Sequence, residues 1–462
     1  MKKNTAVSGT LILASAGFVT RLIGFIYRIL ISRLIGAQAL GLFGLISPIY
    51  FFAFTLCGSG VYMAVSKLAA EAQSDRSAQA VVLPGLTITV LTSLAAVSAL
   101  RLFAEPLGLY FLGDARTIPA LRLLSLALPF CVAGNCFKAY FLGVRKMLVP
   151  AADQVLEQLI RMGVIWLLAA SLCQDNLQGA CTIAVLGNVA GDIVSCLFAM
   201  SAYCIVCRKT KSGVWRLPKH TWRRLLSLSA PLTVNRSVSS ALSGLENIII
   251  PKVLVRSGMS AASALASYGE FGGMAFPIIL FPTLFTNALS TNLLPIVSSA
   301  KISGRYDRLG HAIEGALRVA LYMGFFFGGL FLLTGDFLGQ TLYNSPSAGN
   351  YICLLAFVCP FFYLQSILGG LMNGMDLQTD SLVHTVLCDG IRILILLLAV
   401  PVYGFHAFIL SLILTNILLA VLNLHSLLRV TPVRLRFSRL LTPPTMQEFL
   451  AILPSRKRRQ GR

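Results

Sequence analysis

Charged side chains are scarce in this sequence, and acidic ones are the scarcest. Only 12% of the 462 residues are charged, and 17 acids stand against 38 lysines and arginines. A soluble domain carries about 25% charged residues, so a soluble fold is excluded. The net charge of +21 would suggest nucleic acid in a soluble protein. Here its distribution along the chain predicts a membrane orientation instead, and we expect no nucleic-acid partner.

Several motifs of catalysis are missing. No glycine precedes a lysine, so the chain has no phosphate-binding P-loop and cannot be a nucleotide-driven pump of that class. It has no HExxH zinc motif, and its five histidines are scattered. We therefore expect no enzyme activity, no resident metal and no cofactor. Transport would have to use a Na⁺ or H⁺ gradient, the membrane potential or the substrate's own gradient.

Eleven cysteines resemble a disulfide set only by number, because most of them lie in apolar runs where cysteine acts as a small hydrophobe. Cys173 and Cys181 flank a predicted outside loop, and whether they pair is left open. Cys204 and Cys207 form a single CxxC with no second pair, which disfavours a zinc site.

Long apolar runs dominate the sequence, each of roughly twenty residues, the length that crosses about 30 Å of hydrocarbon. They predict an all-α membrane protein with twelve transmembrane helices. The predicted spans are 8–30, 41–65, 81–103, 119–142, 153–172, 181–206, 226–250, 264–293, 311–334, 350–372, 382–400 and 403–426.

Basic residues gather in alternate loops. If the N-terminus is cytoplasmic, the inside segments receive the basic stretch 207–225 and the basic tail, whereas the outside loops hold only Arg33, Arg116, Lys252 and Arg256. This asymmetry follows the positive-inside rule. It predicts a multi-pass protein of the bacterial cytoplasmic membrane with both termini in the cytoplasm, in contact with membrane lipids.

The chain also repeats itself. Residues 102–169 align without a gap on 333–400, at a constant shift of 231, and Pro129-Phe130 then meets Pro360-Phe361. Both blocks run from an outside loop into the membrane, so the repeat is parallel and predicts two six-helix lobes. We predict an N-terminal lobe at 1–206, a cytoplasmic linker at 207–225, a C-terminal lobe at 226–428 and a cytoplasmic tail at 429–462.

Three pairs of opposite charges have the i,i+3 or i,i+4 spacing of ion pairs on one helical face. We interpret each as structural. They are Glu157 with Arg161, Glu314 with Arg318, and Asp389 with Arg392.

The first span carries two arginines without such a partner. Arg21 and Arg28 share a helical face with Ala14, Gly17 and Gly24. The glycines could mark helix packing, and Arg28 could extend its charge toward the surface. We favour a cavity-facing pair, because the guanidinium fork binds two phosphate oxygens at once and stays charged when desolvated.

Span seven has a broad polar surface, with Asn235 and Arg236 near its start and Glu246 near its end. Asn235 and Arg236 are candidate substrate ligands. Glu246, with Glu270 at the start of span eight, is a candidate for ion coupling or for shaping the cavity. Lys138 and Asp192 also lie within spans, and for these four charges (Lys138, Asp192, Glu246 and Glu270) tertiary pairing and function both remain open.

Three segments resemble the stage V sporulation protein B group of polysaccharide and lipid-linked oligosaccharide flippases. They are Thr20–Arg28, Gln154–Arg161 and the stretch from Tyr268 through Pro282 to Pro295. The resemblance covers nearly the whole chain. It implies the multidrug/oligosaccharidyl-lipid/polysaccharide exporter superfamily, a MATE-like V-shaped fold of two six-helix lobes, and movement of an undecaprenyl-pyrophosphate-linked sugar. Some relatives have two further C-terminal spans that hold the lipid tail, and this sequence ends after twelve.

The leading hypothesis is thus an alternating-access flippase for a lipid-linked oligosaccharide or peptidoglycan precursor, with Arg21, Arg28 and Arg236 on the pyrophosphate. Two rivals stay open. One is a drug/cation antiporter of the same fold, disfavoured by a first span with arginines and no acid. The other is a non-transporting scaffold that binds envelope-synthesis enzymes.

Overall fold

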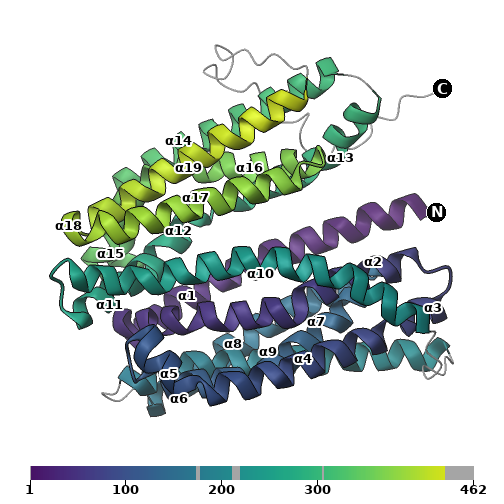
Figure 1. The fold of residues 1–462 in the computed structure, drawn as a ribbon, viewed down its shortest axis with the longest axis horizontal. Helices are drawn as coiled ribbons and strands as arrows, with labels where there is room; N and C mark the ends of the chain where they lie inside the picture. The colour runs from purple at the N-terminus through teal and green to yellow at the C-terminus, as the bar shows by residue number, and fades with distance from the viewer. Residues whose placement is uncertain (1, 173–176, 211–218, 304–305, 432–462) are drawn as a thin grey trace. The chain divides into compact units, whose positions relative to one another are not determined.

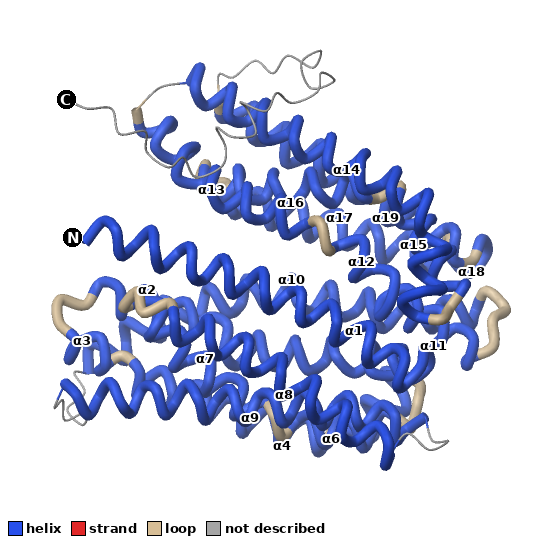
Figure 2. The backbone as a smooth tube through the Cα atoms, turned by 180° about the vertical axis from the view of Figure 1, so that it is seen from behind, coloured by secondary structure: helices blue, strands red, loops and turns tan. Residues whose placement is uncertain are grey.

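A computed structural model describes residues 2–172, 177–210, 219–303 and 306–431. Within these ranges the chain is helical between short turns, as Figure 2 shows. The linker residues 211–218, Cys173 and the tail from residue 432 lie outside the described residues. The predicted Cys173–Cys181 pairing therefore stays a prediction.

The chain divides by its contacts into two compact units. The first comprises residues 1–252 and 261–269. Its helices, of which Figure 1 labels the α-helices, are α1 (Lys2–Phe54), η1 (Thr55–Ser59), α2 (Gly60–Glu71), α3 (Asp75–Ala80), α4 (Val82–Leu102), α5 (Ala104–Pro106), η2 (Leu107–Leu112), α6 (Thr117–Ser125), α7 (Leu128–Gly143), α8 (Leu148–Leu172), α9 (Leu177–Thr210), α10 (Lys219–Arg256) and α11 (Ala261–Gly269).

The second unit comprises residues 253–260 and 270–462. Its helices are η3 (Glu270–Ala275), α12 (Phe276–Leu280), α13 (Thr283–Ile302), α14 (Tyr306–Tyr343), α15 (Pro346–Ala356), α16 (Cys359–Gly374), α17 (Gln378–Leu398), α18 (Val400–Tyr403) and α19 (Phe405–Val430). Most of α10 thus packs with the first unit, although it lies beyond the predicted linker. The predicted lobe boundaries stay a prediction.

The all-α membrane architecture is confirmed, while the count of twelve spans is not. Among the described residues, eight helical stretches are long and apolar enough to cross a membrane, and up to ten if two bent pairs each form one span. The first stretch contains the first two predicted spans, which are two helices separated by a kink at Gly36 (φ 75°, ψ 171°), and the second of them runs on into η1 and α2. Glycine adopts this non-helical conformation without the steric cost of a Cβ. The stretches also leave out α8, which carries three charged residues, Asp153, Glu157 and Arg161.

The internal repeat appears in the secondary structure. Adding 231 to the bounds of α7, 128–143, gives 359–374, which are the bounds of α16. Each helix follows a short break, after Ser125 in one block and after Ala356 in the other, and each carries proline in its first turn (Pro129 and Pro360). Proline fits there because the first amides of a helix have no intrahelical acceptor. The matching residues therefore build matching helices.

Four helices of the first unit position the candidate site. α8 packs along α9, α1 packs against both, and α7 packs against α9. Figures 1 and 2 agree in placing α8 and α9 side by side. A buried apolar cluster holds one end of this group together, with Leu42, Ile46, Leu121, Leu128 and Val185 among its members.

Candidate functional site

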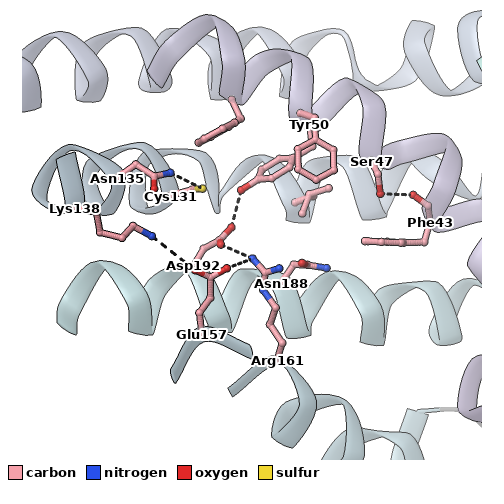
Figure 3. A pocket seen from close by; sticks show the side chains of 13 residues that line it. Phe43, Ser47, Tyr50, Cys131, Asn135, Lys138, Glu157, Arg161, Asn188 and Asp192 are labelled. Atoms are coloured by element: carbon pink, nitrogen blue, oxygen red, sulfur yellow. Dashed lines mark hydrogen bonds and ion pairs between the residues drawn. The ribbon is translucent and has the colours of Figure 1, made fainter. Parts of the chain in front are cut away.

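A cavity of about 260 Å³ lies within the first unit, between α1, α7, α8 and α9. Figure 3 shows the side chains that line it. One wall is aromatic and comes from α1: Phe43, Tyr50, Phe51 and Phe54. The other wall is polar and comes from the remaining three helices: Asn135 and Lys138 of α7, Glu157 and Arg161 of α8, and Asn188 and Asp192 of α9.

Lys138 holds one end of the polar wall. Its Nζ lies 2.9 Å from Oδ2 of Asp153 and 3.8 Å from Oε2 of Glu157. Ser195 Oγ donates a hydrogen bond to the same Asp153 oxygen at 2.9 Å, and Asp153 is fully buried. Charges this deep require partners, because an unpaired buried ion costs several kcal/mol.

Arg161 holds the other end. Its Nη2 lies 2.6 Å from Glu157 and 2.9 Å from Asp192, and the Tyr50 hydroxyl donates to Asp192 Oδ2 at 2.6 Å. Gly191 makes room for this side chain, since an added Cβ would come within 2.6 Å of Arg161 Cγ. The i,i+4 pair predicted within α8 is therefore present, but it is the middle of a chain of contacts that joins four helices.

Arg21 and Arg28 are exposed on α1. A Cβ added at Gly17 or Gly24 would meet no described atom within 4 Å, so these glycines do not mark a helix contact there. Phe18, Leu22 and Ile26, at four-residue steps, form an exposed apolar face beside the arginines. Both arginines are thus exposed on the surface of α1, and their role as ligands stays a prediction. The side chain of Ala14 lies outside the described side chains.

Asn235 and Arg236 are exposed on α10, in the same unit as Arg21 and Arg28. Tyr62 of α2 lies within the electrostatic range of Arg236 and of Lys138. On α1, Tyr27 lies within range of Arg28 and of Arg161.

The two acids predicted to shape a cavity belong to different units. Glu246 is buried in the first unit. Glu270 begins η3 in the second, and its Oε1 accepts a hydrogen bond from Ser345 Oγ at 2.8 Å. Ser345 also caps α15 by accepting from the amide of Ala348, so this contact has a structural purpose. The coupling role of both acids remains a prediction.

The other two predicted ion pairs lie in the second unit. Arg392 Nη2 lies 2.7 Å from Asp389 Oδ1, as the i,i+3 spacing predicts. Glu314 and Arg318 are both buried on α14, and each makes further contacts. Their mutual pairing stays a prediction.

Replacing Arg392 with alanine should lower the amount of folded protein in membranes, because Asp389 would lose its charge partner. Arg392 is 15% exposed, so the loss should be less than the roughly 3–5 kcal/mol of a fully buried pair. Immunoblotting of membranes measures it. Exchanging the two residues should keep most of the protein. Normal abundance with lost transport would instead place Arg392 among the substrate-handling residues.

Sequence reasoning missed most of the cavity. Asp153, Glu157 and Arg161 recur at four-residue steps and so share one face of α8, which was the available signal. Tyr50, Asn135 and Asn188 gave none, because their positions depend on contacts between distant helices. Lys138 and Asp192, left open between pairing and function, both prove to be paired.

The model of the family described as "Polysaccharide biosynthesis protein" matches residues 6–301. The chain belongs to this family. Stage V sporulation protein B of Bacillus subtilis (strain 168) is 28% identical over 451 residues, which are 94% of this chain and 86% of the relative. The resemblance derived from the sequence is thereby confirmed.

Solved structures agree on the fold of this polysaccharide biosynthesis family member. The lipid II flippase MurJ, in an inward closed conformation, superposes with a TM-score of 0.71 at 15% identity, over 96% of this chain and 91% of that one. An inward-facing MATE family transporter of the MOP superfamily gives 0.68 at 14% identity, over 89% and 95%. The chain therefore has the MATE-like fold and is a multi-pass membrane protein.

Proposed function

We propose that this protein is a flippase that moves a lipid-linked glycan with a pyrophosphate headgroup across the bacterial cytoplasmic membrane. The observation that carries the proposal is the open face of α1, where Arg21 and Arg28 are exposed beside Gly17 and Gly24. The Cα atoms of two residues seven apart lie about 10 Å apart along a helix at 1.5 Å per residue. A pyrophosphate and its first sugar can occupy such a span.

Arg236 supplies the third cation of the proposed site, and Asn235 beside it supplies an amide. Arginine binds phosphate through paired N–H donors, and it remains charged in a membrane cavity where lysine would lose its proton more readily. The names of the relatives support a lipid-linked substrate, since one of them is a lipid II flippase.

A translocation assay tests the proposal. Proteoliposomes that contain this protein and a fluorescent lipid-linked disaccharide pyrophosphate are exposed to an impermeant quencher. We expect the protected inner-leaflet fraction to become accessible far faster than in protein-free vesicles, and Arg21→Ala to slow the exchange. Exchange at the protein-free rate, across a panel of lipid-linked sugars, would refute the flippase.

The buried carboxylates of α8 and α9 favour a second candidate, a drug/cation antiporter. Antiporters of this kind exchange a cationic drug for H⁺ or Na⁺ at a titratable acid. Efflux of a cationic dye from vesicles, driven by a Na⁺ or H⁺ gradient and lost in Asp192→Asn, would favour it over the flippase.

Orientation is tested by single cysteines in a variant without native cysteines. Gln73, between α2 and α3, and Arg256, at the end of α10, are both exposed, so either cysteine can react. We expect Arg256→Cys, but not Gln73→Cys, to react with an impermeant thiol reagent in intact cells, since the positive-inside rule places residue 73 in the cytoplasm. Equal labelling before and after the cells are broken would contradict this orientation for Gln73→Cys.

A further inference from the structure

The cavity of the first unit carries an unbalanced charge. Its network holds three carboxylates, Asp153, Glu157 and Asp192, and two cations, Lys138 and Arg161, which leaves one negative charge. The side chains of all five groups are 0–20% exposed. A buried charge without a counter-charge is costly, so either a proton or a ligand with one positive charge would balance it. The other groups of the cavity favour the ligand.

Apart from Lys138 and Arg161, the described residues that line the cavity include no positively charged side chain. The remaining polar groups on the wall are neutral: Ser47 and Tyr50 of α1, Cys131 and Asn135 of α7, and Asn188 of α9. Tyr27 lies within electrostatic range of both Arg161 and Arg28. Arg28 is exposed and is not one of the residues that line the cavity.

The polar wall also offers mainly hydrogen-bond acceptors. Lys138 directs its Nζ to Asp153, Ser195 and Glu157, so its donors are in use. Asn135 and Asn188 each donate within their own helix, to Cys131 Sγ and to the carbonyl of Ala184. Their amide oxygens accept no hydrogen bond from the described residues. A ligand with several donors on a positive centre would satisfy these oxygens.

The opposite wall selects an organic cation over a metal ion. Four aromatic rings, of Phe43, Tyr50, Phe51 and Phe54, face the cavity. A cation over an aromatic face gains about 0.5–2 kcal/mol, and aromatic walls recognise ammonium ligands. The volume of about 260 Å³ lies just below the roughly 300–1,000 Å³ of drug-sized pockets. It therefore suits one small ring or amino-acid side chain.

We propose that this cavity binds a primary ammonium group carried on a sugar-sized body. Glu157 and Asp192 neutralise the ammonium, the amides of Asn135 and Asn188 accept its hydrogen bonds, and the α1 rings cover the ring that carries it. The inference rests on the proposed function in one respect, namely that the ammonium belongs to the transported headgroup. The substrate would then be zwitterionic, with its anionic end at the α1 arginines and its amine in the cavity.

Equilibrium binding tests the site without transport. Purified full-length protein in detergent is dialysed against radiolabelled glucosamine, with glucose and N-acetylglucosamine as unlabelled competitors that lack the positive charge. We expect saturable binding of one glucosamine per chain, which neither neutral sugar displaces at tenfold excess. Glu157→Gln should weaken binding by tenfold or more, because one charge-assisted contact is lost.

Matched variants separate binding from folding. Glu105→Gln removes a carboxylate that pairs with Arg122 on the surface, and it should bind glucosamine normally. Asn188→Leu alters the cavity wall without changing any charge, and it should weaken binding while the melting temperature stays within a few degrees. If Glu157→Gln fails to fold, glucosamine binding to Asn188→Leu still tests whether this cavity is the binding site.

Three results would overturn the proposal. The first is no saturable binding of glucosamine to folded protein. The second is equal binding of N-acetylglucosamine, which would show that the positive charge is irrelevant. The third is displacement of glucosamine by millimolar NaCl together with binding of radioactive Na⁺, which would make this an inorganic cation site. Loss of translocation in Arg21→Ala with normal glucosamine binding would support both sites separately, and failure of the flippase assay would leave the binding result standing.

Discussion

Arg21→Ala should abolish complementation of a strain that lacks its own lipid-linked glycan flippase, while the membrane abundance of the protein stays normal. Arg21 is exposed on an open face of α1, so its loss removes no packing. Losing one charge-assisted contact to phosphate costs roughly 1.5–3 kcal/mol, which is about ten- to a hundredfold in affinity. Arg21→Lys should also be clearly impaired, because an ammonium cannot reproduce the two parallel donors of the fork.

The matched control is Arg101→Ala, which removes an equally exposed arginine from the end of α4 and should complement fully. Arg28→Ala should behave like Arg21→Ala but more mildly. Immunoblotting of membranes controls for folding. Full activity of the Arg21→Ala/Arg28→Ala double variant would show that the headgroup is held elsewhere, and the argument for an anionic substrate would lose its basis.

Lys138→Met should cause the largest loss of folded protein of any single change considered. It would leave Asp153, which is fully buried, with only the Ser195 hydroxyl as a partner. Breaking a buried pair by removing one member costs roughly 3–5 kcal/mol, a large share of the 5–15 kcal/mol that stabilises a typical domain. We expect membrane abundance to fall severalfold and the melting temperature of purified protein to drop.

A second change should restore it. In Lys138→Met/Asp153→Asn the buried charge is gone, and the amide oxygen can still accept from Ser195. The double variant should recover most of the lost abundance, since replacing both members of a buried pair is often neutral. If the double variant is as poorly folded as Lys138→Met alone, Lys138 stabilises the unit by some route other than Asp153.

The sequence predicts the helical membrane architecture because span length is a local property. A run of about twenty apolar residues must be a helix in lipid, where its amides have no water to bind. The internal repeat could also be predicted from the sequence, and α7 and α16 have matching bounds at the constant shift of 231. The kink at Gly36 lies between the first two predicted spans, where a glycine between two apolar runs indicates a break in the helix.

For the candidate site too, the sequence indicates some residues and misses others. The arginines on α1 could be singled out from the sequence, because they lack a partner at helical spacing, and their role in binding stays a prediction. The cavity network could not, since its contacts join residues far apart in the chain. Tyr50 and Asp192 are 142 positions apart, and Lys138 and Ser195 are 57 apart. Spacing within one helix found only Glu157 with Arg161, which led to the interpretation of a purely local structural pair.

The π-helical segment η1, Thr55–Ser59, links the aromatic wall of α1 to α2. Its bonds run from residue i to i+5, whereas those of an α-helix span four residues. The segment therefore stores one surplus residue, and with it about 100° of rotation and 1.5 Å of advance along the helix axis. If η1 tightened into an α-helix, α2 would turn relative to the cavity rings of α1 with no loop and no unfolding. For the same reason, deleting one residue of η1 would leave α1 and α2 facing their present neighbours. A one-residue deletion should therefore disturb the cavity less here than elsewhere in these helices.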